Sequence, residues 1–176
     1  NNVIDEVFEN TTSGIVLRTV NIISNELPIG QDGSGFAVQL EMQDEEDGAL
    51  VEDLDVFISF RDNTVETGET DYDVLEEVMV TTIPSSEFTT GEYGFPQVTY
   101  SLSLEEMLTL LSVDENILNG GDQFYVRFVA NLVDGRSFSF GDNTDTSTGS
   151  FFASPFLYTP TVTCPVPSTA FVGDYL

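Results

Sequence analysis

The sequence predicts an all-β fold, an immunoglobulin- or fibronectin-like antiparallel β-sandwich with one short helix. Three observations lead to this prediction. Apolar residues recur at every second position in several segments of strand length. Turn-forming residues separate these segments at the spacing typical of a sandwich. The chain has 176 residues, 40% of them apolar, with fourteen Phe and six Tyr, which is enough for one domain with its own core.

The domain organisation follows from where this pattern starts and stops. Residues 1–13 are polar with scattered apolar positions, and we interpret them as an N-terminal arm or linker. Residues 14–163 form the β-sandwich. Residues 164–176 contain Pro165 and Pro167, which favour an extended exit, and we expect a linker into a missing or disordered second module. The alternative is a true C-terminus that folds back on the sandwich.

The first half of the chain supplies the clearest alternation. In 35–44, one face carries large apolar side chains and the other carries Ala37, Gln39 and Glu41. We expect a strand with one solvated face there. The same pattern recurs in 51–63, with Phe57 as an exception on the outer face. The inward residues of the two segments are Phe36, Val38, Leu40, Met42, Leu54, Val56, Ile58 and Phe60. Further strands are expected at 14–23, 74–84 and 96–103. The Asn-Glu-Leu-Pro stretch after the first of these is expected to form a turn.

One helix and one hairpin complete the pattern. Ser103 followed by Glu106 is a capping-box signature, so we expect a short helix that ends by Gly120-Gly121 or sooner. The segment 123–140 alternates on both sides of Asp134-Gly135, a dipeptide that favours a two-residue hairpin turn. The segment 156–163 predicts the closing strand.

The charge and the missing residue types restrict the function. The chain has 31 acidic residues and 4 arginines, with no lysine and no histidine, giving a net charge of −27. Such a field repels phosphate, so we expect no nucleic-acid partner. Without histidine, no Ser-His or Cys-His nucleophile forms within this chain. Cys164 is the only cysteine, and an internal disulfide is therefore excluded.

Adjacent acidic pairs do not predict an enzyme. Glu45-Glu46, Glu76-Glu77 and Glu105-Glu106 are the three pairs that could be considered for acid-base catalysis. Neighbours on a strand or helix point apart, whereas catalytic carboxylates must face each other across a cleft. We therefore assign no catalytic residue and expect a non-enzymatic protein.

Calcium is the one cofactor that the acidic loops would suit, because it prefers oxygen ligands. Three loops qualify, at 44–48, 62–73 and 141–149, and none has the EF-hand spacing. The metal-ligand candidates are Asp142, Asn143 and Asp145. Ordinary solvated turn chemistry explains the same residues and is the favoured alternative.

Two groups of aromatic residues are candidates for binding. Glycan capture requires an aromatic platform beside amide or acid groups, and loop-like segments offer Tyr72, Tyr93 and Phe95. The alternative is that these rings pack over the ends of the sandwich. A partner-docking patch is indicated by Phe151, Phe152 and Phe156. The alternative for this group is the core of the last strand.

Several short motifs together carry a family resemblance. They are "DNT" after a long strand, "DGRSFS" in a late hairpin, "FFASPFLYTPTVTCPVP" and then "VGDY". With these motifs, residues 14–176 resemble the first module of surface lipoproteins from Bacteroidota. Such proteins are often encoded beside starch-utilisation-type importers, which combine a TonB-dependent barrel with a lid lipoprotein. The family's lipid-bearing cysteine would lie before Asn1, so Cys164 does not match it.

The resemblance implies a location and two functions. The protein would be tethered at the outer membrane by an upstream lipid anchor and would face outward. As an accessory of the barrel importer and its lid, it would capture a glycan or peptide nutrient. The alternative is a purely structural subunit of another outer-membrane assembly, with no ligand of its own. An exposed aromatic cleft would favour the first function, and a Phe-rich face buried against another protein would favour the second.

Overall fold

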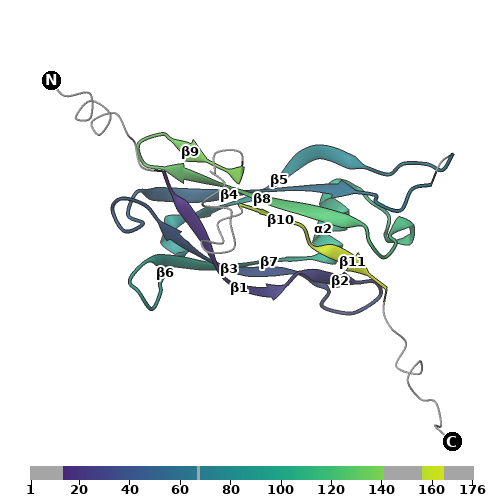
Figure 1. Ribbon diagram of the computed structural model, residues 1–176, viewed down its shortest axis with the longest axis horizontal. Coiled ribbons are helices and arrows are strands. Elements are labelled where there is room, and N and C mark those ends of the chain that lie inside the picture. Colours follow the sequence, from purple (N-terminus) through teal and green to yellow (C-terminus); the bar gives the residue numbers. More distant parts are fainter. Residues whose placement is uncertain (1–13, 67, 141–155, 165–176) are drawn as a thin grey trace, which may run out of the picture.

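The protein is a β-sandwich of two packed sheets, with one α-helix (Figure 1). The computed structural model describes residues 14–66, 68–140 and 156–164. The prediction of an all-β sandwich with one short helix is confirmed. Neighbouring strands are antiparallel except for one parallel pair. The immunoglobulin- or fibronectin-like strand arrangement stays a prediction.

The first sheet has four strands in the order β1-β3-β7-β6. The alternation expected for 35–44 is confirmed, because its four large apolar side chains face the core and are buried. The bounds are β1 Val16–Ser24, β3 Gly35–Gln43, β6 Thr89–Thr90 and β7 Pro96–Ser103.

The second sheet follows the order β2-β11-β8-β4-β5, and β9 and β10 also pair with β8. The alternation in 51–63 is confirmed as well, with its inward residues fully buried. Phe57 stays on the outer face, where the Arg127 guanidinium lies 4.8 Å from its ring centre. The bounds are β2 Glu26–Pro28, β4 Val51–Arg61, β5 Val74–Pro84, β8 Gln123–Leu132, β9 Ser137–Phe138, β10 Leu157–Tyr158 and β11 Thr161–Thr163.

An aromatic cluster joins the two sheets in the core. Phe128 of β8 contacts Tyr100 of β7 and Tyr158 of β10 edge to face, with ring centres 5.6 and 5.8 Å apart. Phe36 of β3 lies 5.4 Å from Tyr158. Because these rings come from both sheets, they fix how the sheets are stacked. Burial raises the pKa of both tyrosines to about 12.

The helix α2, Leu104–Leu111, forms where the sequence predicts it. Ser103 accepts a hydrogen bond from the Glu106 amide, and the Glu106 carboxylate accepts from the Ser103 amide, which confirms the capping box. Ser112 ends the helix in the left-handed conformation, at φ 55°. Leu104, Met107 and Leu111 face the core, so α2 closes one end of the sandwich. The single-turn helices are η1 Ser85–Glu87 and η2 Glu115–Ile117.

Two features of the fold differ from the expectations. Glu41 was expected on the solvated face of β3 but is only 2% exposed. Arg18 of β1 and Gln97 of β7 both donate to its carboxylate from the flanking strands and cover it. The Asn-Glu-Leu-Pro stretch was expected to be a turn, but Glu26–Pro28 is the strand β2, paired in parallel with β11. Leu27 is buried there, and a three-residue strand is too short to show a period.

In the described part of the chain, the sheet edges are unsuited to pairing with another chain. The edge strands β2 and β6 have three and two residues. The long edge strands β1 and β5 each contain two register shifts against their neighbours. Short or bulged edges discourage strand addition from other molecules. A contact at these edges would therefore use side chains more than the backbone.

Candidate functional site

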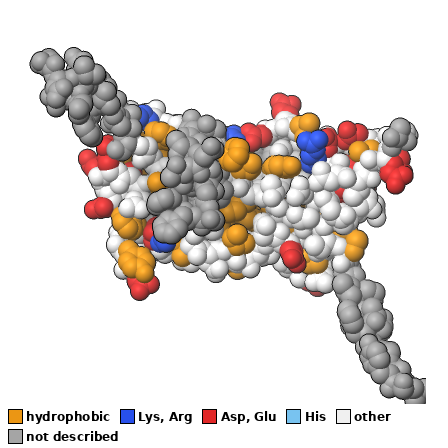
Figure 2. Space-filling model, viewed as in Figure 1, with side chains coloured by type: hydrophobic (Ala, Val, Ile, Leu, Met, Phe, Trp, Pro, Cys, Tyr) orange, Lys and Arg blue, Asp and Glu red, His pale blue; other side chains and the backbone are white. Residues whose placement is uncertain are grey.

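Three loops gather at the α2 end of the sandwich, on the right in Figure 1. They are 29–34 between β2 and β3, 62–73 between β4 and β5, and 112–122 between α2 and β8. We call this region the loop end. Acidic side chains gather over its β4–β5 loop (Figure 2). The turns after β3, β6 and β8 lie at the opposite end of the strands.

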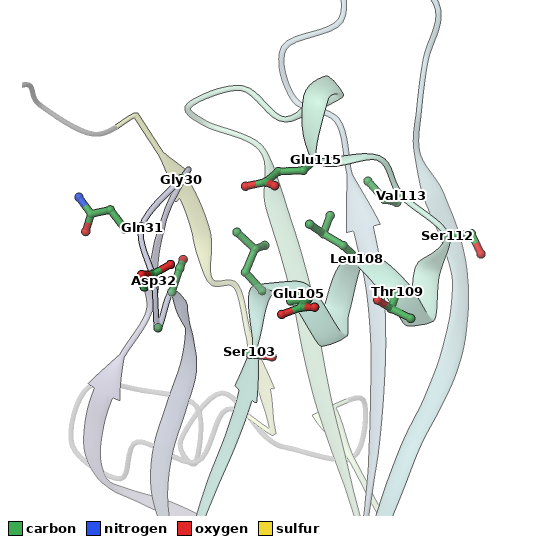
Figure 3. Close-up of a pocket in the computed structure, with 13 residues that line it drawn as sticks. Gly30, Gln31, Asp32, Ser103, Glu105, Leu108, Thr109, Ser112, Val113 and Glu115 are labelled. Atoms are coloured by element: carbon green, nitrogen blue, oxygen red, sulfur yellow. The ribbon is translucent and has the colours of Figure 1, made fainter.

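The larger hollow at the loop end lies between the β2–β3 loop and α2 and has a volume of about 750 Å³. We call it the α2 groove. Asp32 lies on one side of this groove, and Glu105, Leu108 and Glu115 lie on the other (Figure 3). The remaining lining residues are Gly30, Gln31, Gly33, Ser34, Ser103, Leu104, Thr109, Ser112 and Val113.

A second hollow of about 460 Å³ lies on the other side of η2 and contains one of the predicted tyrosines. We call it the Tyr72 recess. The Tyr72 ring is 45% exposed and shares the recess with Glu69, Asn116 and Asn119. The side-chain amide NH2 groups of both asparagines donate locally, to Asp114 and to the Ile117 carbonyl. Their carbonyl oxygens and the Glu69 carboxylate make the recess rich in hydrogen-bond acceptors.

A buried carboxylate holds the loops of the Tyr72 recess together. Asp122 is fully buried, and its two oxygens accept from the backbone amides of Asn119, at 2.7 Å, and Asn63, at 3.1 Å. Asn63 in turn donates to the Gly121 carbonyl and to Gln123. The loop after β4 is thus tied to the loop before β8. No local sequence pattern predicts this contact, because it joins segments about sixty residues apart.

The three aromatic ligand candidates do not form one platform. Tyr72 lies at the loop end. Tyr93 and Phe95 lie in the β6–β7 turn at the opposite end of the sandwich, where Tyr93 is 69% exposed and Phe95 is half-buried. Tyr72 lies beside amide and acid side chains of the kind that a glycan site requires.

The phenylalanine and metal candidates fall largely outside the described residues. Phe151, Phe152, Asp142, Asn143 and Asp145 all do so. Phe156 is described and is fully buried, and its carbonyl accepts from the Phe128 amide at 2.8 Å. This burial contradicts a docking role for Phe156, which packs in the core directly before β10.

The two described acidic loops use their carboxylates to close turns. Asp44 accepts from the amides of Glu46, Gly48 and Leu50, and Asp73 accepts from the Asp62 amide. Over 14–66, 68–140 and 156–164, no group of three or more acidic, Cys or His residues is placed to hold a metal ion. Calcium binding at 141–149 stays a prediction.

The adjacent acidic residues serve separate purposes. Glu77 pairs with Arg127 through two hydrogen bonds of 2.6 Å, and Glu76 beside it is exposed. Hydrogen bonds from the Ser103 side chain and backbone hold the pKa of Glu106 below its usual range. Glu105 lines the α2 groove instead.

Comparisons with known proteins leave the site to be interpreted from its own geometry. No family model matches the chain, and no curated protein matches it either. None of the helices in the described residues is both long and apolar enough to span a membrane.

Proposed function

We propose that this protein is a non-enzymatic accessory lipoprotein on the outer face of the outer membrane, where it captures a glycan for a barrel importer and its lid lipoprotein. The Tyr72 recess is the observation that supports glycan capture. A half-exposed tyrosine lines a hollow together with Glu69, Asn116 and Asn119, whose side-chain oxygens can accept hydrogen bonds. Sugar rings offer apolar C–H faces to an aromatic side chain and hydroxyl donors to such acceptors.

The positions of the two ends of the described sandwich agree with this proposal. Gly14 lies beside Phe138, at the end opposite the recess. Cys164 lies beside Gly120, at the loop end. The chain therefore enters the described sandwich at the end opposite the Tyr72 recess, which is the arrangement expected for an upstream anchor and an outward-facing ligand site.

The ligand test compares two exposed tyrosines at opposite ends. The probe is a mixture of short neutral oligosaccharides of glucose, mannose and xylose, with binding measured by calorimetry. Tyr72→Ala is expected to abolish binding, whereas Tyr93→Ala is expected to leave it unchanged. Because both variants lose one exposed ring and no charge, they are matched. Equal binding by both variants, or no binding by the unmodified protein, would contradict glycan capture at Tyr72.

The partner test is gentle detergent extraction of the tagged full-length protein, followed by mass spectrometry of what remains bound. Co-purification of a barrel importer with its lid lipoprotein is the expected result. Recovery of the protein alone would contradict the accessory role.

A second candidate function is a structural subunit of another outer-membrane assembly. The specific observation in its favour is the edge strand β1, which exposes Val20, Ile22 and Ile23 by 39, 51 and 54%. Adjacent exposed apolar side chains on an edge strand are typical of a protein contact. Recovery with a different outer-membrane complex, together with loss of that complex on Ile22→Ser and Ile23→Ser substitution, would support this candidate over the first.

A further inference from the structure

Asp62 is a buried carboxylate with one unused oxygen at the Tyr72 recess. It directly follows β4, lines the recess and is only 8% exposed. Its Oδ1 atom accepts from the amide of Thr64 at 3.1 Å and from the Thr64 hydroxyl at 3.2 Å. Its Oδ2 atom has no hydrogen-bond partner within residues 14–66, 68–140 and 156–164. Because Oδ2 nevertheless keeps contact with solvent, a ligand in the recess can reach it.

The β4–β5 loop brings Asp62 and Tyr72 to the same hollow. The Asp62 amide donates to Asp73 Oδ1 at 2.8 Å, which ties the start of this loop to its end. Tyr72 directly precedes Asp73 and lines the recess together with Asp62. A largely buried carboxylate oxygen without a donor costs free energy, and a donor from a ligand would recover it. The recess therefore combines an aromatic ring with an acceptor that the described structure leaves unsatisfied.

The charges around the recess restrict which group can bind there. Glu69 adds a second carboxylate to the lining, and its Oε2 atom accepts from the Glu66 amide at 3.1 Å. None of the four arginines of the chain lines the recess. An anionic group would therefore face two carboxylates without a cation to offset them. Because Asp62 is largely shielded from water, this repulsion is stronger than on an open surface. A neutral hydroxyl meets no such penalty.

We propose that the Tyr72 recess binds neutral glycans and rejects acidic ones, and that Asp62 sets this preference. A sugar hydroxyl donates to Asp62 Oδ2, whereas Asp62 and Glu69 repel a uronate or sulfate group. Selectivity of this kind comes from a penalty on the wrong ligand as well as from a contact with the right one. The inference rests on the proposed function, because it names the class of glycan that the same site captures.

The test compares ligands that differ in charge on one ring. The neutral probes are trimers of glucose, mannose and xylose, and the acidic probes are trimers of glucuronate and mannuronate. Methyl esters of the two acidic trimers keep the ring and its substituent but remove the charge. We expect at least one neutral trimer to bind in calorimetry. We expect each acidic trimer to bind at least about tenfold more weakly than its own methyl ester.

Substitutions then assign this preference to the recess. Asp62→Asn keeps the side-chain shape and removes its charge, so we expect the ratio of ester to acid affinity to fall at least about threefold. Glu69→Gln should change the ratio in the same direction, and it provides the readout if Asp62→Asn does not fold in thermal unfolding. Glu92→Gln removes one charge from an exposed residue at the opposite end and should leave the ratio unchanged.

The outcomes separate this inference from glycan capture itself. If a neutral trimer binds and the acidic trimers bind as tightly as their esters, the charge selection is overturned and glycan capture stands. An equal change of the ratio in Glu92→Gln and in the recess variants would assign the selection to the general field of the protein and would also overturn it. If no neutral trimer binds, both proposals are contradicted.

Discussion

Removal of the Asp122 carboxylate should weaken both the fold and the Tyr72 recess. Asp122 is fully buried and accepts from the amides of Asn63 and Asn119. A hydrogen bond to a charged group contributes about 1.5–3 kcal/mol. Asp122→Ala loses two of them, so we expect a loss of about 3–6 kcal/mol in the free energy of unfolding. Asp122→Asn keeps one acceptor and should cost about half as much.

The assay is urea unfolding, with Glu92→Gln as the matched control. Glu92 is exposed, and this substitution removes one negative charge without a buried contact, so it corrects for relief of general repulsion. At about 2–4 °C for each kcal/mol, Asp122→Ala should also lower the Tm by at least about 6 °C. Hydrogen exchange should accelerate first at the amides of Asn63 and Asn119. A stability within about 0.5 kcal/mol of the control would show that the two hydrogen bonds to Asp122 do not stabilise the fold.

Three further predictions concern other parts of the sandwich. Arg18→Met leaves the buried Glu41 carboxylate without its cation and should cost about 3 kcal/mol, whereas the double variant with Glu41→Gln should recover at least about 1 kcal/mol; purely additive costs in urea unfolding would contradict a coupled pair. Ser103→Ala should cost about 1 kcal/mol at neutral pH. Because the Glu106 pKa is lowered, the stabilisation is present above the ordinary glutamate pKa and is lost as pH falls through the lowered value, so the difference in Tm between the two proteins should shrink in acid. A difference that stays constant with pH would argue against this linkage. Phe156→Ala should cost about 3–5 kcal/mol, and a loss near zero would place its side chain outside the core.

The strand pattern could be predicted because each buried face produces a local alternation of apolar and polar residues. In β3 and β4, apolar residues alternate along the strand, and these residues are buried in the core. The capping box at Ser103 and Glu106 is equally local, and α2 begins there. The edge strand β2 was missed because three residues do not establish a period.

The hollows of the candidate site could not be predicted in the same way. The α2 groove combines Asp32 with Glu115, and the Tyr72 recess combines Tyr72 with Asn119, each from loops distant in sequence. Only the packing of the two sheets brings these loops to one end. The burial of Glu41 has the same origin, because its partners stand on the two neighbouring strands.

The most direct test of ligand capture at the loop end is a chemical-shift titration of the isotope-labelled full chain with the neutral oligosaccharide mixture. We expect saturable shifts at Tyr72, Asn116 and Asn119, with Tyr93 at the opposite end unaffected. We expect the same shifts to disappear in Tyr72→Ala. Shifts centred on Tyr93, or none at any oligosaccharide concentration reached, would contradict it.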